Sequence, residues 1–218
     1  GFVWLLTQLP HVFALQEALD AGRPVPASAA RLDRAVPWVP YLEIELAFRM
    51  DMLAAFMSLI VLGVGALVLA YCARYFREHE PRNAVFGGQL LAFAGAMFGL
   101  VTTDDLMVLY TFWEITSVLS FLLIGYSGHR IFARRSAITA LIVTTFGGLA
   151  MLAGLIMLAH FAGSWRISGV LEAAPALMAD AGLRGLLEVA VALVLIGALT
   201  KSAQAPFHFW LPGAMAAP

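Results

Sequence analysis

The chain has 218 residues, of which 61% are hydrophobic and 12% are charged, and its formal net charge is −1. Soluble globular chains carry about 25% charged residues, so this composition excludes an ordinary soluble domain. The near-neutral charge predicts no nucleic-acid partner, and a single cysteine, Cys72, excludes an internal disulfide framework and any four-cysteine metal or iron–sulfur site.

The first apolar segment, residues 1–19, is short for a membrane span and contains glutamine, proline and histidine. Because the sequence begins within an apolar segment and without an initiator methionine, we interpret this segment as the remainder of a transmembrane helix. Residues 20–50 follow as a proline-rich external connection. Within it, Tyr41–Arg49 alternates apolar and mostly polar residues, and this period of two predicts a short extramembrane β-strand or hairpin near 41–49.

Residues 51–218 are dominated by long runs with few or no charges, each of about the 20 residues that span a bilayer core as a helix. The predicted helices of this bundle are 52–73, 83–103, 106–128, 136–160 and a broken helix at 185–217. Together with the first segment, they predict an all-α polytopic membrane protein with about six transmembrane helices in this portion. The connection at 165–184 has the composition of a surface helix, and the bundle is expected to be incomplete at its C-terminus.

Two short loops, 74–82 and 130–135, each contain three arginines, whereas the loop between them contains only Asp104 and Asp105 as charged residues. Short basic loops favour the cytoplasmic side, so both arginine loops are predicted to be cytoplasmic in a plasma-membrane protein. The connection at 20–50 then lies outside despite its four arginines. Asp104 and Asp105 are predicted to be solvated acids at the external surface, or else a cation entry point.

Lys201 is the single lysine of the chain, and it lies inside an otherwise apolar run. The twelve residues before it, Val189–Thr200, are uncharged, as are all residues after it. A buried charge in a bilayer costs about 3 kcal/mol even on lenient scales, so a function is the default hypothesis. Lysine, unlike arginine, can lose its proton on burial, which makes Lys201 a candidate for proton transfer.

Glu114 lies eight residues into its predicted span, which places it about 12 Å deep, near the middle of the hydrocarbon core. One interpretation is a structural acid that stabilises helix packing. The other is a proton-transfer group that pairs with Lys201, since two opposite charges at similar depth on separate helices attract one another. Moving or neutralising Glu114 would then alter how firmly Lys201 holds its proton.

Pro206 cannot donate a hydrogen bond to the carbonyl of Ser202, so the helix that carries Lys201 should kink or break there. Broken helices at mid-membrane depth are typical of ion sites in transporters, although a plain proline kink is the alternative. His208 follows two residues later and is either a proton relay or a hydrogen-bonded structural group. The glycine pairs Gly87-Gly88 and Gly147-Gly148 are interpreted as close helix contacts.

Two stretches resemble a known family closely. They are Phe112–Tyr126 (FWEITSVLSFLLIGY) and Thr200–Pro212 (TKSAQAPFHFWLP). Both are similar to the signature helices of antiporter-like proteins, namely the A subunit of the Mrp-type multisubunit cation/proton antiporters and the large membrane-arm subunits of respiratory complex I. The sequence around His208, Pro-Phe-His-Phe-Trp-Leu-Pro, and the Phe-Gly-Gly at 146–148 resemble the Mrp protein more than complex I.

The resemblance implies that Glu114 and Lys201 are the family's proton-transfer pair and that His208 is its broken-helix histidine. It also implies further helices beyond Pro218. One departure is Gly213, which stands where the family usually has aspartate, and this puts a charge role of that position in doubt.

The predicted function is proton translocation within a multisubunit Na⁺/H⁺ antiporter, a secondary transporter and not an enzyme. Its expected partners are other membrane subunits, H⁺, Na⁺ or another monovalent cation, and the lipid bilayer. No cofactor or metal is predicted, because the chain has no motif for one. The alternative is a proton-pumping subunit of complex I or of a related membrane hydrogenase, and a third possibility is an inactive membrane scaffold.

Overall fold

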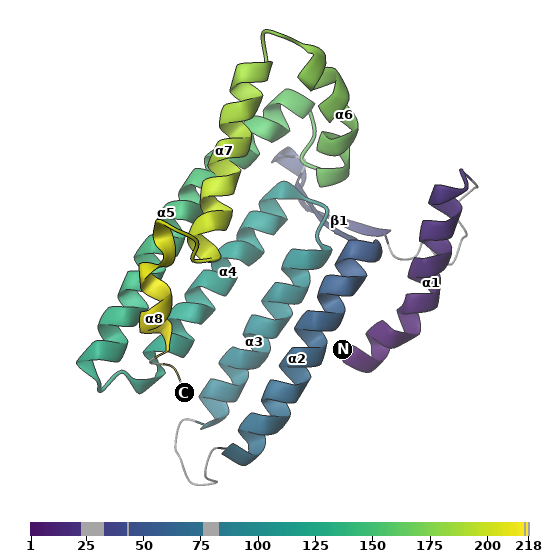
Figure 1. The fold of residues 1–218 in the computed structure, drawn as a ribbon. Helices are drawn as coiled ribbons and strands as arrows, with labels where there is room; N and C mark the ends of the chain where they lie inside the picture. The colour runs from purple at the N-terminus through teal and green to yellow at the C-terminus, as the bar shows by residue number, and fades with distance from the viewer. Residues whose placement is uncertain (23–32, 43, 76–82, 216, 218) are drawn as a thin grey trace. The chain divides into compact units, whose positions relative to one another are not determined.

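A computed structural model describes residues 1–22, 33–42, 44–75, 83–215 and 217 of the chain. The elements, in chain order, are α1 (Phe2–Asp20), β1 (Asp33–Val39), the 3₁₀ turn η2 (Pro40–Leu42), β2 (Ile44–Arg49), α2 (Met52–Tyr75), α3 (Asn83–Thr102), α4 (Leu106–Ile124), η3 (Gly125–Ser127), α5 (Ile131–Ala162), α6 (Ile167–Ala179), α7 (Arg184–Lys201), η4 (Phe207–Trp210) and α8 (Leu211–Ala214). The predicted fold class is confirmed: the chain is mainly helical, with one small antiparallel hairpin (Figure 1).

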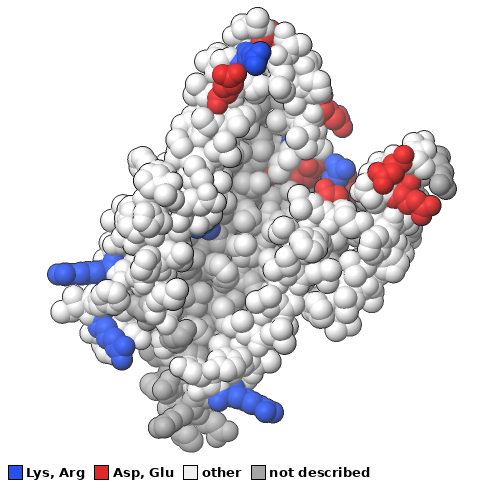
Figure 2. All heavy atoms as spheres, in the orientation of Figure 1, with Lys and Arg blue, Asp and Glu red and all other residues white. Residues whose placement is uncertain are grey.

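Four helices among the described residues are long and apolar enough to cross a membrane. They are α2, α3, α5, and α4 together with the turn η3. The helices α1 and α7 have 19 and 18 residues, and α7 carries three charged residues, Arg184, Glu188 and Lys201. Charged atoms cover little of the visible surface, which is mostly white in Figure 2. Such a surface suits contact with lipid and with other apolar helices.

The chain divides into two compact units, Gly1–Leu109 and Tyr110–Pro218. In the first unit, α1 packs on α2 and α2 packs on α3. The core of this contact is formed by Leu5 and Val12 of α1 with Ala55 of α2, against which Phe98 of α3 also packs. All three side chains of that core are almost completely buried, so it is apolar burial that holds these helices together.

The hairpin predicted near 41–49 is present, but its exact extent differs from the sequence pattern. The strand β2 begins at Ile44, while Tyr41 lies in the turn η2. Its partner β1 was not predicted, and it pairs antiparallel to β2 with Asp33 opposite Arg49. Pro37 lies within β1, and a proline in a run argues against a strand unless the strand is at an edge, as it is in a two-stranded sheet.

The prediction that Asp104 and Asp105 are solvated acids is wrong, because their residues are only 5% and 1% exposed. The Asp105 carboxylate accepts hydrogen bonds from the backbone N–H groups of Met107 and Val108, at 2.8 and 3.0 Å. It therefore caps the first turn of α4, whose free N–H groups require acceptors. The Asp104 N–H donates to the Ala47 carbonyl at 2.9 Å, so the hairpin backbone covers this turn.

In the second unit, the 32-residue helix α5 packs along α7, and α8 folds against α5 (Figure 1). Small residues permit the close approach of α5 and α7. A Cβ added at Gly154 would lie 2.5 Å from the Ala190 carbonyl oxygen, and one added at Gly197 would lie 2.5 Å from Met151 Cβ. These two glycines set the spacing of the helices that carry the candidate site.

Candidate functional site

The helix α7 ends at Lys201, five residues before the proline at which the sequence predicted the break. Ala203 has a φ of 51°, a left-handed conformation that turns the chain away from the helix axis. The last carbonyls of α7 still find donors, because Trp210 Nε1 donates to the Thr200 carbonyl at 2.9 Å. The helix is therefore discontinuous as predicted, and Lys201 lies at the point where it stops.

The Lys201 ammonium is held by three acceptors on one side of α4. Lys201 Nζ donates to the Trp113 carbonyl at 2.8 Å, to Ser117 Oγ at 3.0 Å and to Thr116 Oγ1. It also lies 4.6 Å from the centroid of the Trp113 ring, which is a cation–π contact. An ammonium has three N–H donors, so these partners satisfy all of them.

Glu114 does not form the direct ion pair with Lys201 that the sequence suggested. No carboxylate oxygen of Glu114 lies within 4.0 Å of Lys201 Nζ, and Glu114 Oε1 is buried without a hydrogen-bond partner among the described residues. The lysine instead contacts Trp113, directly before Glu114, and Thr116 and Ser117, two and three residues after it on α4. The two charges are nevertheless close enough to interact electrostatically. Glu114 and Lys201 thus lie on contacting parts of α4 and α7 without a direct ion pair.

Two adjacent glycines of α5 make room for this site. A Cβ at Gly148 would overlap Glu114 Oε1 and lie 3.4 Å from its carboxyl carbon. A Cβ at Gly147 would overlap the Thr200 hydroxyl and lie 2.6 Å from Thr200 Cβ. Gly147 and Gly148 are thus close helix contacts, as predicted. Gly87 and Gly88 are not, because a Cβ on either would meet nothing within 4 Å among the described residues.

Glu114 also borders a groove along α4 of about 470 Å³. Its lining residues are Tyr110, Thr111, Glu114, Ile115, Val118 and Leu119, so Glu114 is the one acid in an otherwise apolar and hydroxyl-bearing wall. Glu114 Oε1 thus packs against Gly148 of α5, and the residue also borders this groove. A half-buried acid in such a position is a candidate for proton exchange.

Pro206 precedes η4, and His208 lies within it with an exposed side chain. No hydrogen bond joins His208 to Glu114 or Lys201 in the described part of the chain. Gly213 lies in α8 against α5, where an added Cβ would come 3.0 Å from Ser136 Oγ and 3.2 Å from Ser136 Cβ. The structure thus brings Glu114 and Lys201 together and leaves His208 at the surface of this unit.

Sequence reasoning missed the two hydroxyl partners, Thr116 and Ser117, and the role of Trp113. A signal existed, since both hydroxyls lie within one turn of Glu114 in an apolar run. Serine and threonine in helices usually bond to their own backbone, however, and both do so here. Which face of α4 meets Lys201 depends on packing that the sequence does not encode locally.

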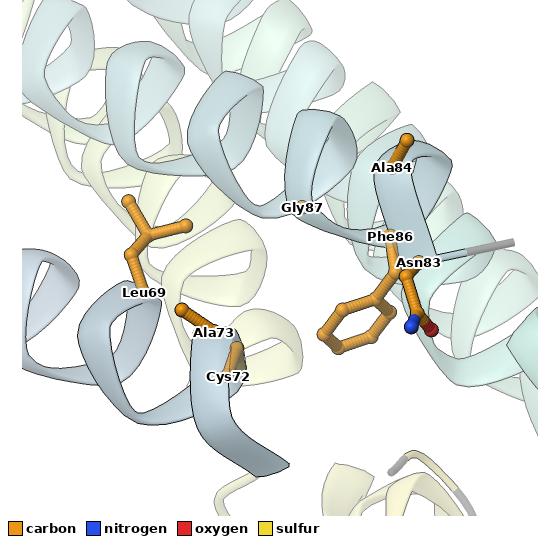
Figure 3. A pocket seen from close by; sticks show the side chains of 7 residues that line it. All are labelled: Leu69, Cys72, Ala73, Asn83, Ala84, Phe86 and Gly87. Carbon is orange, nitrogen blue, oxygen red and sulfur yellow. The ribbon is translucent and has the colours of Figure 1, made fainter. Parts of the chain in front are cut away.

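A separate cavity of about 400 Å³ lies between the end of α2 and the start of α3 (Figure 3). It is lined by Leu69, Cys72, Ala73, Asn83, Ala84, Phe86 and Gly87. None of these seven described residues carries a charged side chain.

A family model described as NADH:quinone oxidoreductase/Mrp antiporter, transmembrane, matches residues 103–218. A second, described as NADH-ubiquinone oxidoreductase (complex I) chain 5 N-terminus, matches residues 38–86. The chain belongs to the NADH:quinone oxidoreductase/Mrp antiporter family, as its two signature stretches predicted. It is a multi-pass membrane protein.

Among curated relatives, a probable K⁺/H⁺ antiporter A/B subunit of Rhizobium meliloti is 45% identical over 89% of this chain and 19% of its own length. The A subunit of the Na⁺/H⁺ antiporter of Alkalihalophilus pseudofirmus is 41% identical over 86% of this chain and 23% of its own length. The chain thus spans about a fifth to a quarter of the length of these relatives.

Two solved structures share the fold. A chain of the Mrp complex from a Dietzia species matches with a TM-score of 0.78 and 33% identity, over 99% of this chain and 24% of its own. A chain of an archaeal membrane-bound sulfane sulfur reductase matches with a TM-score of 0.67 and 20% identity, over 100% of this chain and 42% of its own. The second likeness concerns the fold alone.

Proposed function

We propose that this chain is part of a proton-translocating subunit of a multisubunit monovalent cation/proton antiporter. The observation that carries the proposal is the Lys201 ammonium, held at the break of α7 by acceptors on the helix that bears Glu114. A titratable cation at such a break is typical of transporter ion sites. The antiporter names of relatives that are 41 to 45% identical support the same function.

In this proposal Lys201 binds and releases a proton, and Glu114 acts as its charge partner. Glu114 borders the α4 groove, whereas Lys201 is held by Trp113, Thr116 and Ser117 of the same helix. A change in the position or charge of Glu114 alters the free energy of the Lys201 ammonium and so couples the two protonation states. His208, directly after the break, is proposed as a relay to the groups beyond it.

The partners proposed for the complete subunit are other membrane subunits, H⁺, Na⁺ or another monovalent cation, and the lipid bilayer. The proposed location is the plasma membrane, with the arginine loops at 74–82 and 130–135 on the cytoplasmic side. Arg74, Arg130, Arg134 and Arg135 belong to the described residues, whereas Arg77 and Arg82 lie outside them. The support is the excess of arginine in these short loops.

The second candidate is a proton-pumping subunit of complex I or of a related membrane hydrogenase, which the N-terminal family match favours. The same Glu114 and Lys201 would then couple to electron transfer in other subunits. The genes beside this one separate the two candidates. Small antiporter subunits would indicate the first, and iron–sulfur and flavin subunits the second.

The test is Lys201→Arg in the full-length protein within its assembled complex. A guanidinium keeps its proton at any accessible pH, so it preserves the charge but cannot release a proton. We expect cation-driven proton flux in inverted vesicles to fall below about one-tenth of the wild-type rate, since proton-transfer groups commonly contribute 10² or more. Arg184→Lys is the matched control, because Arg184 lies on the same helix in an exposed pair with Glu188.

An assembled Lys201→Arg complex that runs at the wild-type rate would refute the proposal. Lys201 would then be a structural counter-ion, and the proton would take another route.

A further inference from the structure

The three partners of Lys201 Nζ differ in their chemistry. The Trp113 carbonyl can only accept a hydrogen bond, whereas the hydroxyls of Thr116 and Ser117 can both accept and donate. Both hydroxyl residues are buried, at 0% and 2% exposure. Two of the three groups around Lys201 Nζ can therefore act either as acceptor or as donor, because a hydroxyl can reverse the direction of its hydrogen bond.

In the observed state both hydroxyls donate to the same atom, the Trp113 carbonyl oxygen. The distances to that oxygen are 2.7 Å from Thr116 Oγ1 and 3.1 Å from Ser117 Oγ, and Lys201 Nζ donates to it as well at 2.8 Å. A carbonyl oxygen has two lone pairs and here receives three side-chain donors. One hydroxyl can therefore turn away without leaving this oxygen unsatisfied.

A neutral amine requires a hydrogen-bond donor as a partner, whereas the ammonium requires only acceptors. It has two N–H donors and one lone pair, and a buried lone pair without a donor is unfavourable. A carbonyl oxygen cannot supply that donor, but a hydroxyl can. A site that holds only the ammonium needs acceptors alone, whereas a site that holds both states of the amine needs at least one hydroxyl.

We propose that Thr116 and Ser117 are positioning residues that stabilise Lys201 in both of its protonation states. When the ammonium gives one proton to a water molecule, the lone pair formed on Nζ accepts the O–H of Thr116 or Ser117, which turns from the Trp113 carbonyl to the amine. When water returns a proton to Nζ, the hydroxyl turns back and accepts from the ammonium. This inference rests on the proposed function, since it requires Lys201 to exchange protons during transport.

The experiment uses the full-length protein in its assembled complex and measures cation-driven proton flux in inverted vesicles as a function of cation concentration. The variants are Thr116→Val, Ser117→Ala and their double combination, with Thr116→Ser as the conservative replacement. Valine keeps the volume of threonine but has no hydroxyl. Ser120→Ala is the matched control, because Ser120 makes the same kind of bond to the backbone of α4, at 2.7 Å to the Thr116 carbonyl, without contacting Lys201.

We expect the maximal rate of the double variant to fall at least about tenfold, since the buried amine then has no hydroxyl donor for its lone pair, and a buried polar group without a partner costs a factor of about ten or more in rate. The cation concentration for half-maximal rate should stay within about twofold, because the hydroxyls act on the proton and not on the cation. Thr116→Ser should retain most of the wild-type rate. If the double variant does not assemble, the two single variants carry the test, each with a smaller loss.

A double variant, or both single variants, at the wild-type rate would overturn the inference. Equal losses for Thr116→Ser and Thr116→Val would overturn it too, since the methyl group and not the hydroxyl would then matter. Lys201→Arg, measured in parallel, separates this outcome from failure of the proposed function. An inactive Lys201→Arg beside fully active hydroxyl variants leaves proton transfer by Lys201 intact and removes only the role of Thr116 and Ser117.

Discussion

Glu114 has a buried carboxylate oxygen that accepts no hydrogen bond from any described residue. A buried donor beside it also has no hydrogen-bond partner among the described residues. That group is Trp113 Nε1, a donor without an acceptor, which would lie 3.7 Å from a Cβ at Gly148. Unsatisfied buried polar groups are rare and concentrate at functional sites. No described residue donates a hydrogen bond to Glu114 Oε1, so the packing against Gly148 is what positions this oxygen.

The charge of Glu114 is testable separately from its size. Glu114→Gln keeps the side-chain length but removes the charge and the titratable proton. We expect proton flux in vesicles to fall at least about tenfold while the complex still assembles, because a neutral amide cannot act as the charge partner of Lys201. Glu114→Asp should retain part of the flux, since the charge remains and the carboxylate only withdraws from Gly148.

Glu188→Gln is the control for this pair of variants, because Glu188 is exposed and pairs with Arg184 at the other end of α7. Exposed ion pairs contribute little, so its flux should match the wild type. Near-normal flux in an assembled Glu114→Gln complex would contradict the role of Glu114.

The residues of the site were predictable to different degrees. Glu114 and Lys201 are charges in apolar runs, and the cost of such charges in a bilayer marks them from sequence alone. Thr116 and Ser117 carry no such mark, because a hydroxyl that bonds to its own helix is tolerated in any membrane span. Their contact with Lys201 arises from the rotation of α4 relative to α7, which depends on packing over 84 or more residues of separation.

At the scale of helices, Gly147 is the position where α5 leaves room for the end of α7. Gly147→Ala would place a Cβ against the Thr200 side chain, next to Lys201. Overpacking of this kind typically costs about 1–3 kcal/mol. We expect a lower melting temperature of the purified complex and a reduced flux, because relief of the overlap displaces Lys201 from its three acceptors.

Gly185→Ala is the matched control, since Gly185 lies in the first turn of α7 and an added Cβ meets nothing within 4 Å there. Alanine is favoured over glycine in a helix by about 0.5–1 kcal/mol, so this variant should be unchanged or slightly more stable. Equal melting temperatures for both variants would argue against a close contact at Gly147.

The cap of α4 gives a second prediction at this scale. Asp105→Ala removes the acceptor of the Met107 and Val108 N–H groups and should cost about 1–2 kcal/mol of stability. Thermal unfolding of the purified complex measures the loss, and Glu172→Ala on the partly exposed helix α6 is the control. A change no larger than that of the control would mean that the hairpin, and not Asp105, maintains this turn.

Most helices could be predicted from the sequence, because an apolar run of about 20 residues has few alternatives to a helix in a bilayer. The end of α7 could not be placed correctly, since proline marks where a helix cannot continue but not where the chain turns before it. In the structure the turn begins at Ser202, directly after Lys201. The burial of Asp104 and Asp105 was missed because it depends on cover from the hairpin, whose strand β1 contains a proline and gives a weak signal.

For the molecule as a whole, the number of spans constrains which loops share a side of the membrane. Three candidate spans, α2, α3 and α4 with its terminal turn, lie between the hairpin and the loop at 128–130. From this odd number of candidate crossings we predict that Asp33 and His129 lie on opposite sides of the membrane. We predict that the side with the arginine-rich loop at 130–135 is the cytoplasmic one, since positively charged short loops are usually retained in the cytoplasm.

The last prediction tests this topology with single cysteines in the full-length protein, after Cys72→Ser has removed the native thiol. Asp33→Cys and His129→Cys replace exposed residues, so either thiol is accessible to an aqueous reagent on its own side. Asp33→Cys should react with an impermeant maleimide added to intact cells, whereas His129→Cys should react only after the membrane is opened. Labelling of both from outside would contradict three crossings between them, because an odd number of spans cannot return the chain to the same side. The reverse pattern would keep the three crossings but invert the direction, so the arginine-rich loop at 130–135 would lie outside, against the charge rule that predicts it in the cytoplasm.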